Sequence, residues 1–167
     1  ANLSSHKRGW DDRWEFFAEY ADKGAQIQQE LIHLVDEDTR SFNVLMDAFR
    51  LPNGNDGEKT IRQEAIQKAT QYAAEVPLKV MQTSLKGYEI LEAMAEHGME
   101  SSISDIGVGA LCLRTCVTGA WLNVRINAQS ITDETFKINL LNTGSEVENA
   151  SEVKSVGILA KVNGKIK

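Results

Sequence analysis

The chain has 167 residues, the size of one ordinary domain, so a two-domain organisation is not expected. Its 24 acidic and 18 basic residues give a net charge of −6, which argues against binding nucleic acid by neutralising phosphates. With 42% apolar and 25% charged residues the composition is that of a folded globular protein, and no apolar run approaches the roughly 18–20 residues of a membrane helix. We therefore expect a soluble, mostly helical domain.

Apolar residues recur three and four positions apart near the N-terminus and, more clearly, from Gln26 to Phe49, which predicts a helix. Asp38 falls inside this apolar stripe. It is either a buried acid paired with Arg40, Arg125 or a backbone amide, or a carboxylate that faces a polar cleft between helices. Because an unpaired buried carboxylate is costly, both interpretations require a polar group opposite Asp38.

A loop dense in turn-forming residues, 51–57, precedes the longest predicted helix. Asp56 can cap this helix, Pro77 is expected to bend it, and Gly98 ends it. A rod of about 40 residues would be about 60 Å long, which is too long for a small globule without flanking neighbours. Such a helix favours self-association.

A further helix is predicted from about Asp105 to Asn127. Its many glycines and alanines lower helix propensity but allow close approach to a neighbouring helix or a ligand. Asp105 is either a helix cap or a proton-transfer group beside a bound ligand. Asn123 and Asn127 share one helix face and either bond to a neighbouring helix or contact a ligand.

The last element is predicted to begin at a cap, Asp133. From residue 142 to 167 the composition shifts and Thr143-Gly144 interrupts the pattern, so this segment is expected to be a weak last helix or partly disordered. The chain is thus predicted to be one domain, residues 1–167. Its expected fold is an all-α antiparallel bundle of four to five helices with one long Pro-kinked helix, and it is expected to be oligomeric.

Few side chains suggest chemistry on spacing alone. Cys112 and Cys116 are expected to be reduced and buried, which fits a cytoplasmic location. Lys7 and Arg8 form a basic cluster that is either solvated surface or a site for an anionic substrate tail. No metal is expected, because no metal-ligand spacing relates the three histidines, His6, His33 and His97.

Several separated motifs resemble the cyclodeaminase/cyclohydrolase family. They are the stretches LVDEDTRSFN (34–43), VPL (76–78), SDIGVGA (104–110) and GAWLNVRIN (119–127), followed by Thr132-Asp133. Their order and spacing make the resemblance specific from about Leu3 to Phe136. It is strongest to the cyclodeaminase part of formiminotransferase-cyclodeaminases.

The resemblance implies an all-helical protein whose site forms between subunits of dimers and larger rings. It implies conversion of 5-formiminotetrahydrofolate to 5,10-methenyltetrahydrofolate and ammonia in histidine degradation. The resemblance implies no metal and no cofactor beyond the tetrahydrofolate substrate, which includes polyglutamylated forms. It also implies fusion to a formiminotransferase domain. The resemblance implies Asp105 as the catalytic residue, and as substrate-binding residues it implies Asp38, Asn43, Asn123, Asn127 and, for the glutamate tail, Lys7.

Family members begin with a Pro-Gly-Gly-Gly-Ser segment and a small-residue helix ahead of the position of Ala1. The sequence therefore predicts an N-terminally truncated fragment, whose own activity stays open. Two other functions remain: a methenyltetrahydrofolate cyclohydrolase, in which water attacks the one-carbon unit, and a non-enzymatic helical module that oligomerises.

Overall fold

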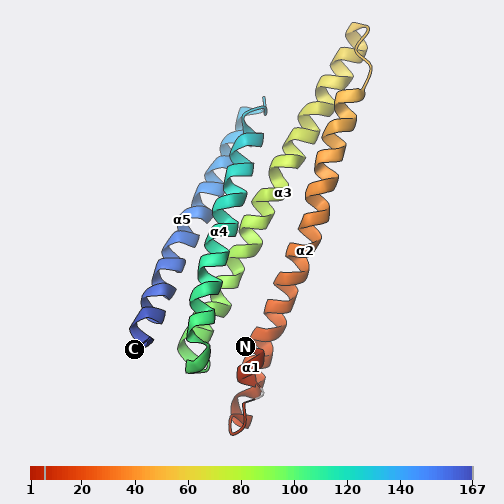
Figure 1. Cartoon of the computed structure of the whole chain (residues 1–167). Coiled ribbons are helices and arrows are strands. Elements are labelled where there is room, and N and C mark those ends of the chain that lie inside the picture. The colour runs from red at the N-terminus through yellow and green to blue at the C-terminus, as the bar shows by residue number, and fades with distance from the viewer. Residues whose placement is uncertain (6, 167) are drawn as a thin grey trace.

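The computed structural model describes residues 1–5 and 7–166, so His6 and Lys167 lie outside the described residues. Four long helices form an antiparallel bundle (Figure 1). The elements in order are α1 (Asn2–Ser5), η1 (Asp11–Arg13), α2 (Trp14–Arg50), α3 (Asp56–His97), η2 (Glu100–Ser102), α4 (Ile103–Ala128) and α5 (Glu134–Lys165). The predicted all-α bundle is confirmed, whereas its oligomeric state stays a prediction.

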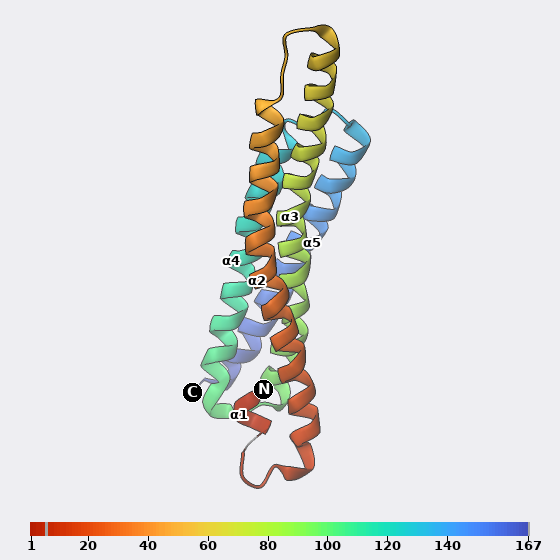
Figure 2. The same ribbon diagram turned by 90° about the vertical axis from the view of Figure 1, so that its right-hand side faces the viewer.

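Helix α3 is the central helix of the bundle, because it packs against α2, α4 and α5. Helix α4 also packs against α5. The hairpin of α2 and α3 extends beyond the turn between α4 and α5 (Figure 2), and both chain termini lie at the opposite end of the bundle (Figure 1). The two sides of α3 are therefore covered unequally.

The helix starts follow local capping chemistry. Asn55, and not the predicted Asp56, caps α3, because its extended backbone lets its side chain accept a 2.9 Å hydrogen bond from the Glu58 amide. At the start of α5 the predicted cap is confirmed, since Asp133 accepts a 3.0 Å hydrogen bond from the amide of Phe136. Helix α4 begins slightly earlier than predicted, at Ile103.

Pro77 lies inside α3, and the helix continues through it. Proline has no N–H, so the carbonyl of Ala73, four residues earlier, loses its helical donor. The side-chain amide of Asn127 on α4 donates a 2.8 Å hydrogen bond to that carbonyl. Of the two roles considered for Asn127, the structure thus shows the bond between helices.

Helix α5 runs without interruption to Lys165, so the predicted break at Thr143-Gly144 is wrong. Gly144 is buried against α4, and a Cβ placed on it would overlap the ring of Trp121. The glycine therefore serves close packing of two helices rather than a turn.

Candidate functional site

A groove of about 440 Å³ opens between α2 and α4 over the surface of α3, and we call it the α2–α4 groove. Its lining is mostly apolar, and six of the lining residues are glycine, serine or cysteine. The lining consists of Gly24, Ile27, Leu31, Ser84, Gly87, Ile90, Leu91, Gly109, Cys112, Leu113 and Cys116. Small side chains keep the groove open, so this region can admit a ligand.

Asp105 lies at one end of this groove. It is exposed in the first turn of α4, where the positive end of the helix dipole favours a carboxylate. It lines a cavity of about 240 Å³ that shares Ile90 and Leu91 with the α2–α4 groove and is also lined by Ala1, Leu3 and Ser4. The structure thus places Asp105 beside an apolar space as well as near a helix start.

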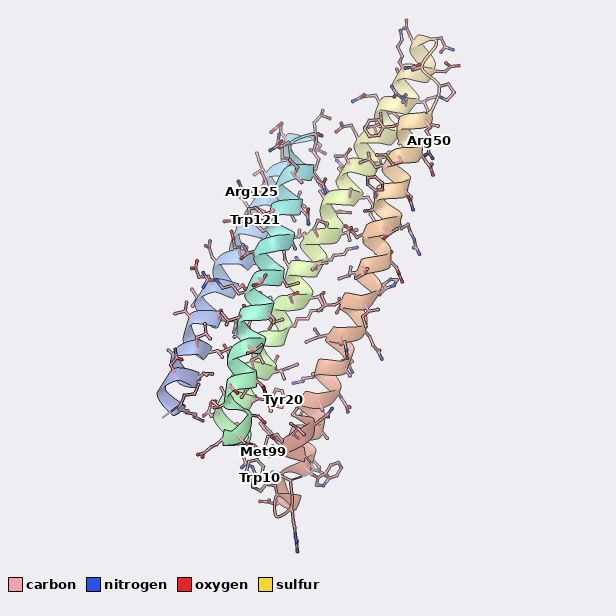
Figure 3. The ribbon with its side chains drawn as sticks, in the orientation of Figure 1. Trp10, Tyr20, Arg50, Met99, Trp121 and Arg125 are labelled. Atoms are coloured by element: carbon pink, nitrogen blue, oxygen red, sulfur yellow. The ribbon has the colours of Figure 1, made fainter. Side chains whose placement is uncertain are left out.

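Lys7 lies in the cavity next to that of Asp105. This polar cavity measures about 650 Å³ and shares Gly98 and Met99 with the Asp105 cavity. The Lys7 ammonium lies 4.1 Å from the centroid of the Trp10 ring, a cation–π contact, and Arg13 and Lys165 also line the cavity. Trp10 and Met99 are close together near the start of α4 (Figure 3). Glu96 and Glu100 line the same cavity, so three basic and two acidic side chains surround the space next to that of Asp105.

Asp38 and Asn127 lie at the same level of the bundle, far from Asp105. Glu37 accepts a hydrogen bond from the Tyr72 hydroxyl, and the next residue of α3, Ala73, accepts the bond from Asn127. The Asp38 side chain is exposed, so the prediction that it faces a buried or enclosed polar partner is wrong. Helix α2 packs mainly against α3, which leaves part of the apolar stripe around Asp38 uncovered.

The remaining candidates also lie toward that second end. Asn43 and Asn123 are exposed on α2 and α4. Asp105 and Asn123 are 18 residues apart, or five turns, so they lie on one side of α4 but about 27 Å apart. Figure 3 shows the same separation, with Met99 near the start of α4 and Trp121 and Arg125 toward its end. Within one chain the structure places Lys7 in the cavity that adjoins the Asp105 cavity, whereas the other four residues line neither.

Both cysteines are free, and the prediction that they are buried is wrong. Cys112 is exposed, and Cys116 is partly exposed with its sulfur 3.3 Å from the Ser84 hydroxyl. They face the α2–α4 groove rather than the contact with α5. The helical spacing predicts that the two cysteines share one face of α4, but it does not predict whether that face contacts another helix or lines a groove.

Sequence reasoning missed Gln67, which holds the turn between α4 and α5 against α3. Its side-chain amide donates a 3.0 Å hydrogen bond to the Ser130 carbonyl, and its oxygen accepts 2.9 Å hydrogen bonds from the amide and the hydroxyl of Thr132. A lone glutamine gives no local signal for such contacts, because all its partners lie more than 60 residues away in the sequence.

The outer face of α4 is apolar and uncovered. Val108, Leu111, Leu122 and Ile126 are 50–59% exposed. Residues 100–128 are long and apolar enough to cross a membrane by length and composition alone, although 28% of the most apolar window is buried in the bundle. This result qualifies the expectation from the sequence that no membrane-like segment is present.

The fold and the site define a class: a helical bundle with a carboxylate at the mouth of an apolar groove and basic and acidic side chains in the adjoining cavity. The model of the formiminotransferase-cyclodeaminase family matches residues 1–146. The chain belongs to this family.

Relatives and a solved structure agree with this membership. The chain is 38% identical over 112 residues to a formimidoyltransferase-cyclodeaminase of Gallus gallus, covering 67% of the chain and 21% of that relative. It is 30% identical over 135 residues to a methenyltetrahydrofolate cyclohydrolase of Methylorubrum extorquens, covering 81% of the chain and 65% of that relative. The crystal structure of a formiminotetrahydrofolate cyclodeaminase from Thermotoga maritima matches with a TM-score of 0.84 and 25% identity, covering 99% of this chain and 79% of that one. The chain thus spans about a fifth of the length of the matched Gallus gallus relative.

Proposed function

We propose that this chain carries the folate site of a cyclodeaminase, which converts 5-formiminotetrahydrofolate to 5,10-methenyltetrahydrofolate and ammonia. The observation that carries the proposal is the position of Asp105, exposed at the start of α4 between an apolar groove and a polar cavity that Lys7, Arg13 and Lys165 line together with two glutamates. Membership in the formiminotransferase-cyclodeaminase family supports it.

The chemistry suits a single carboxylate. Nitrogen 10 of the folate attacks a one-carbon unit already held on the same molecule, so the step is intramolecular and needs no covalent nucleophile. The tetrahedral centre that forms must lose ammonia. Asp105 takes the proton from nitrogen 10, returns one to the departing amine, and stabilises the cationic amidine and product by its charge.

The adjoining cavities suggest how the folate lies. Lys7, Arg13 and Lys165 can bind its glutamate tail in a cavity that Glu96 and Glu100 also line, and its one-carbon unit then lies toward Asp105. We propose a reaction with no cofactor beyond the tetrahydrofolate, in the cytoplasm, as a step of histidine degradation. The names of the relatives, which combine a transferase with a cyclodeaminase, support a fused formiminotransferase domain.

The proposal is tested by following methenyltetrahydrofolate absorbance with the wild type and Asp105→Asn. Loss of the acid/base should reduce the rate by about 10²–10⁴. Asp56→Asn is the matched control, because Asp56 is also an exposed aspartate in the first turn of a long helix but lies at the tip of the α2–α3 hairpin. Equal rates for wild type and Asp105→Asn would refute the assignment.

Methenyltetrahydrofolate cyclohydrolase activity is the second candidate function. The similarity to the Methylorubrum extorquens cyclohydrolase, over 81% of this chain, favours it. Supplying the formimino and the methenyl folate separately and comparing turnover distinguishes the two. Turnover of the methenyl substrate alone would replace the cyclodeaminase proposal.

A second copy of the chain would complete the set of polar residues. On α4, Val108 and Leu122 lie at equal distances in sequence from Thr115. An antiparallel contact between two copies of α4, centred on Thr115, would cover the apolar outer face. Asp105 would then lie near the level of the second copy's Asn123.

Sedimentation analysis tests this contact. Leu122→Ser should weaken self-association, because it removes apolar area at the proposed contact, and should leave the helix content unchanged. Val153→Ser is the control, since Val153 is 72% exposed on α5, away from that face. Equal association of the two variants would exclude the α4 contact.

A further inference from the structure

The two thiols of the α2–α4 groove form a pair that the proposed reaction does not use. Cys112 and Cys116 are free, lie four residues apart on one side of α4, and both line the groove. Cys112 is exposed to solvent, and the sulfur of Cys116 lies 3.3 Å from the Ser84 hydroxyl. A small molecule that enters the groove therefore meets two sulfur atoms.

The geometry of a helix decides what these sulfurs can bind together. Residues four apart on a helix have Cβ atoms about 5–6 Å apart. A disulfide needs Cβ atoms about 3.8 Å apart, so a direct bond would distort the helix. An atom placed between the two sulfurs and bonded to both makes up the difference in length. Such an atom must prefer sulfur and accept two thiolate ligands.

The lining of the groove indicates what else the ligand carries. Leu31 of α2, Leu91 of α3 and Leu113 of α4 line the same groove as the thiol pair, and the groove measures about 440 Å³. An apolar group attached to the thiophilic atom can replace water against these side chains. The site thus fits an organic compound of a soft element better than a hydrated ion.

We propose that Cys112 and Cys116 together bind thiophilic ligands of the trivalent organoarsenical class. The arsenic–oxygen bond of an organic arsenoxide and two S–H bonds break, and two arsenic–sulfur bonds form. The two protons leave with the oxygen as water, and arsenic stays trivalent, so no oxidant or reductant is needed. Binding does not depend on the proposed function. A bound arsenical would also obstruct folate at the α2–α4 groove, and this consequence rests on the proposed function.

The reduced full chain is incubated with phenylarsine oxide and analysed by mass spectrometry under native and denaturing conditions. We expect one phenylarsine per chain, retained against excess 2-mercaptoethanol and released by a 1,2-dithiol. Cys112→Ser and Cys116→Ser should each lower retention by about 10²-fold, because a second bond within one molecule acts at high effective concentration.

A matched control keeps two thiols but separates them. Cys116→Ser combined with Gly119→Cys places the sulfurs seven residues apart, about 10 Å along the helix. A side chain at Gly119 meets nothing within 4 Å, so the helix can accept it. This variant should behave like the single serine variants. Retention equal to that of the wild type, or arsenic that joins two chains, would overturn the proposal.

Folate binding separates this proposal from the proposed function. The arsenical-loaded chain should bind tetrahydrofolate more weakly than the free chain in calorimetry. Retained arsenical with unchanged folate binding would show that folate does not bind in the α2–α4 groove, and it would confirm the thiol site. Folate turnover without retained arsenical would overturn the thiol site alone.

Discussion

The two sides of α3 are packed in different ways. Toward α4 and α5 the helices approach closely, with Gly144 against the Trp121 ring and a buried 2.8 Å hydrogen bond between Tyr88 and Ser151. Burial of this tyrosine raises its pKa, so the hydroxyl stays a neutral partner in the core. At these two places the helices are in close contact.

Toward α2 the contact combines an apolar cluster around Phe17 with polar pairs along one edge. Lys23 bonds to Glu89 at 3.0 Å, Thr83 to Glu30 at 2.9 Å, and Tyr72 to Glu37. The other edge of α2 lines the α2–α4 groove. The comparison teaches that small residues bring α4 and α5 into close contact, whereas the candidate site lies where α2 and α4 stay apart over α3.

The largest expected effect tests the closely packed side. In Gly144→Ala the new methyl overlaps the Trp121 ring, and the bundle should lose about 1–3 kcal/mol of unfolding free energy, as overpacked cores do. Gly157→Ala on the same helix meets nothing within 4 Å and should gain about 0.5–1 kcal/mol from helix propensity. Urea unfolding measures both changes. Two changes of the same sign would mean that α4 and α5 do not approach closely at Gly144.

The next effect concerns Asn127 and Pro77. Asn127→Ala leaves the Ala73 carbonyl without a donor and should cost about 1–3 kcal/mol. In a Pro77→Ala background the restored N–H can bond to that carbonyl, so the same substitution should cost less. A double-mutant cycle in urea measures the difference. Equal costs in the two backgrounds would assign Asn127 to a role other than satisfying this carbonyl.

These residues show how far the sequence could predict the fold and the site. Helical periodicity predicted the long helices and the cap at Asp133, because both depend on residues near in sequence. The motifs around Pro77 and Asn127 stand far apart in the sequence. The bond that joins them depends on the register of two antiparallel helices, which no local pattern encodes.

The errors have the same origin. Gly144 was interpreted as an interruption because its partner, Trp121, lies on another helix. Asp38 was expected to meet a polar group because an apolar stripe suggests burial, yet α2 has one main neighbour among the long helices. Asp105 was placed near a helix start correctly, but the cavity beside it is formed partly by the N-terminal residues and by α3. Whether a side chain on a helix face is exposed depends on which other helices pack against that face.

The smallest expected effect tests the polar edge of α2. The hydrogen bond from Tyr72, with Arg40 nearby, holds the pKa of Glu37 below its ordinary value of 4.5, and Thr83 and Lys86 lower that of Glu30. A carboxylate whose pKa is lowered by folding stabilises the protein above its unfolded pKa, and this contribution disappears as the pH falls through the folded pKa. The wild type should therefore be more stable than Tyr72→Phe at pH 7, and the two should converge below about pH 4.

Tyr20→Phe is the matched control, because it removes a hydroxyl from α2 and leaves the pair of Glu37 and Tyr72 intact. It should follow the wild type through the acid range, whereas Glu37→Gln should lose part of the acid dependence. Thermal unfolding between pH 3 and 7 measures all four proteins. If the difference between wild type and Tyr72→Phe stayed constant with pH, the hydroxyl would contribute through packing, and the polar edge would not depend on the charge of Glu37.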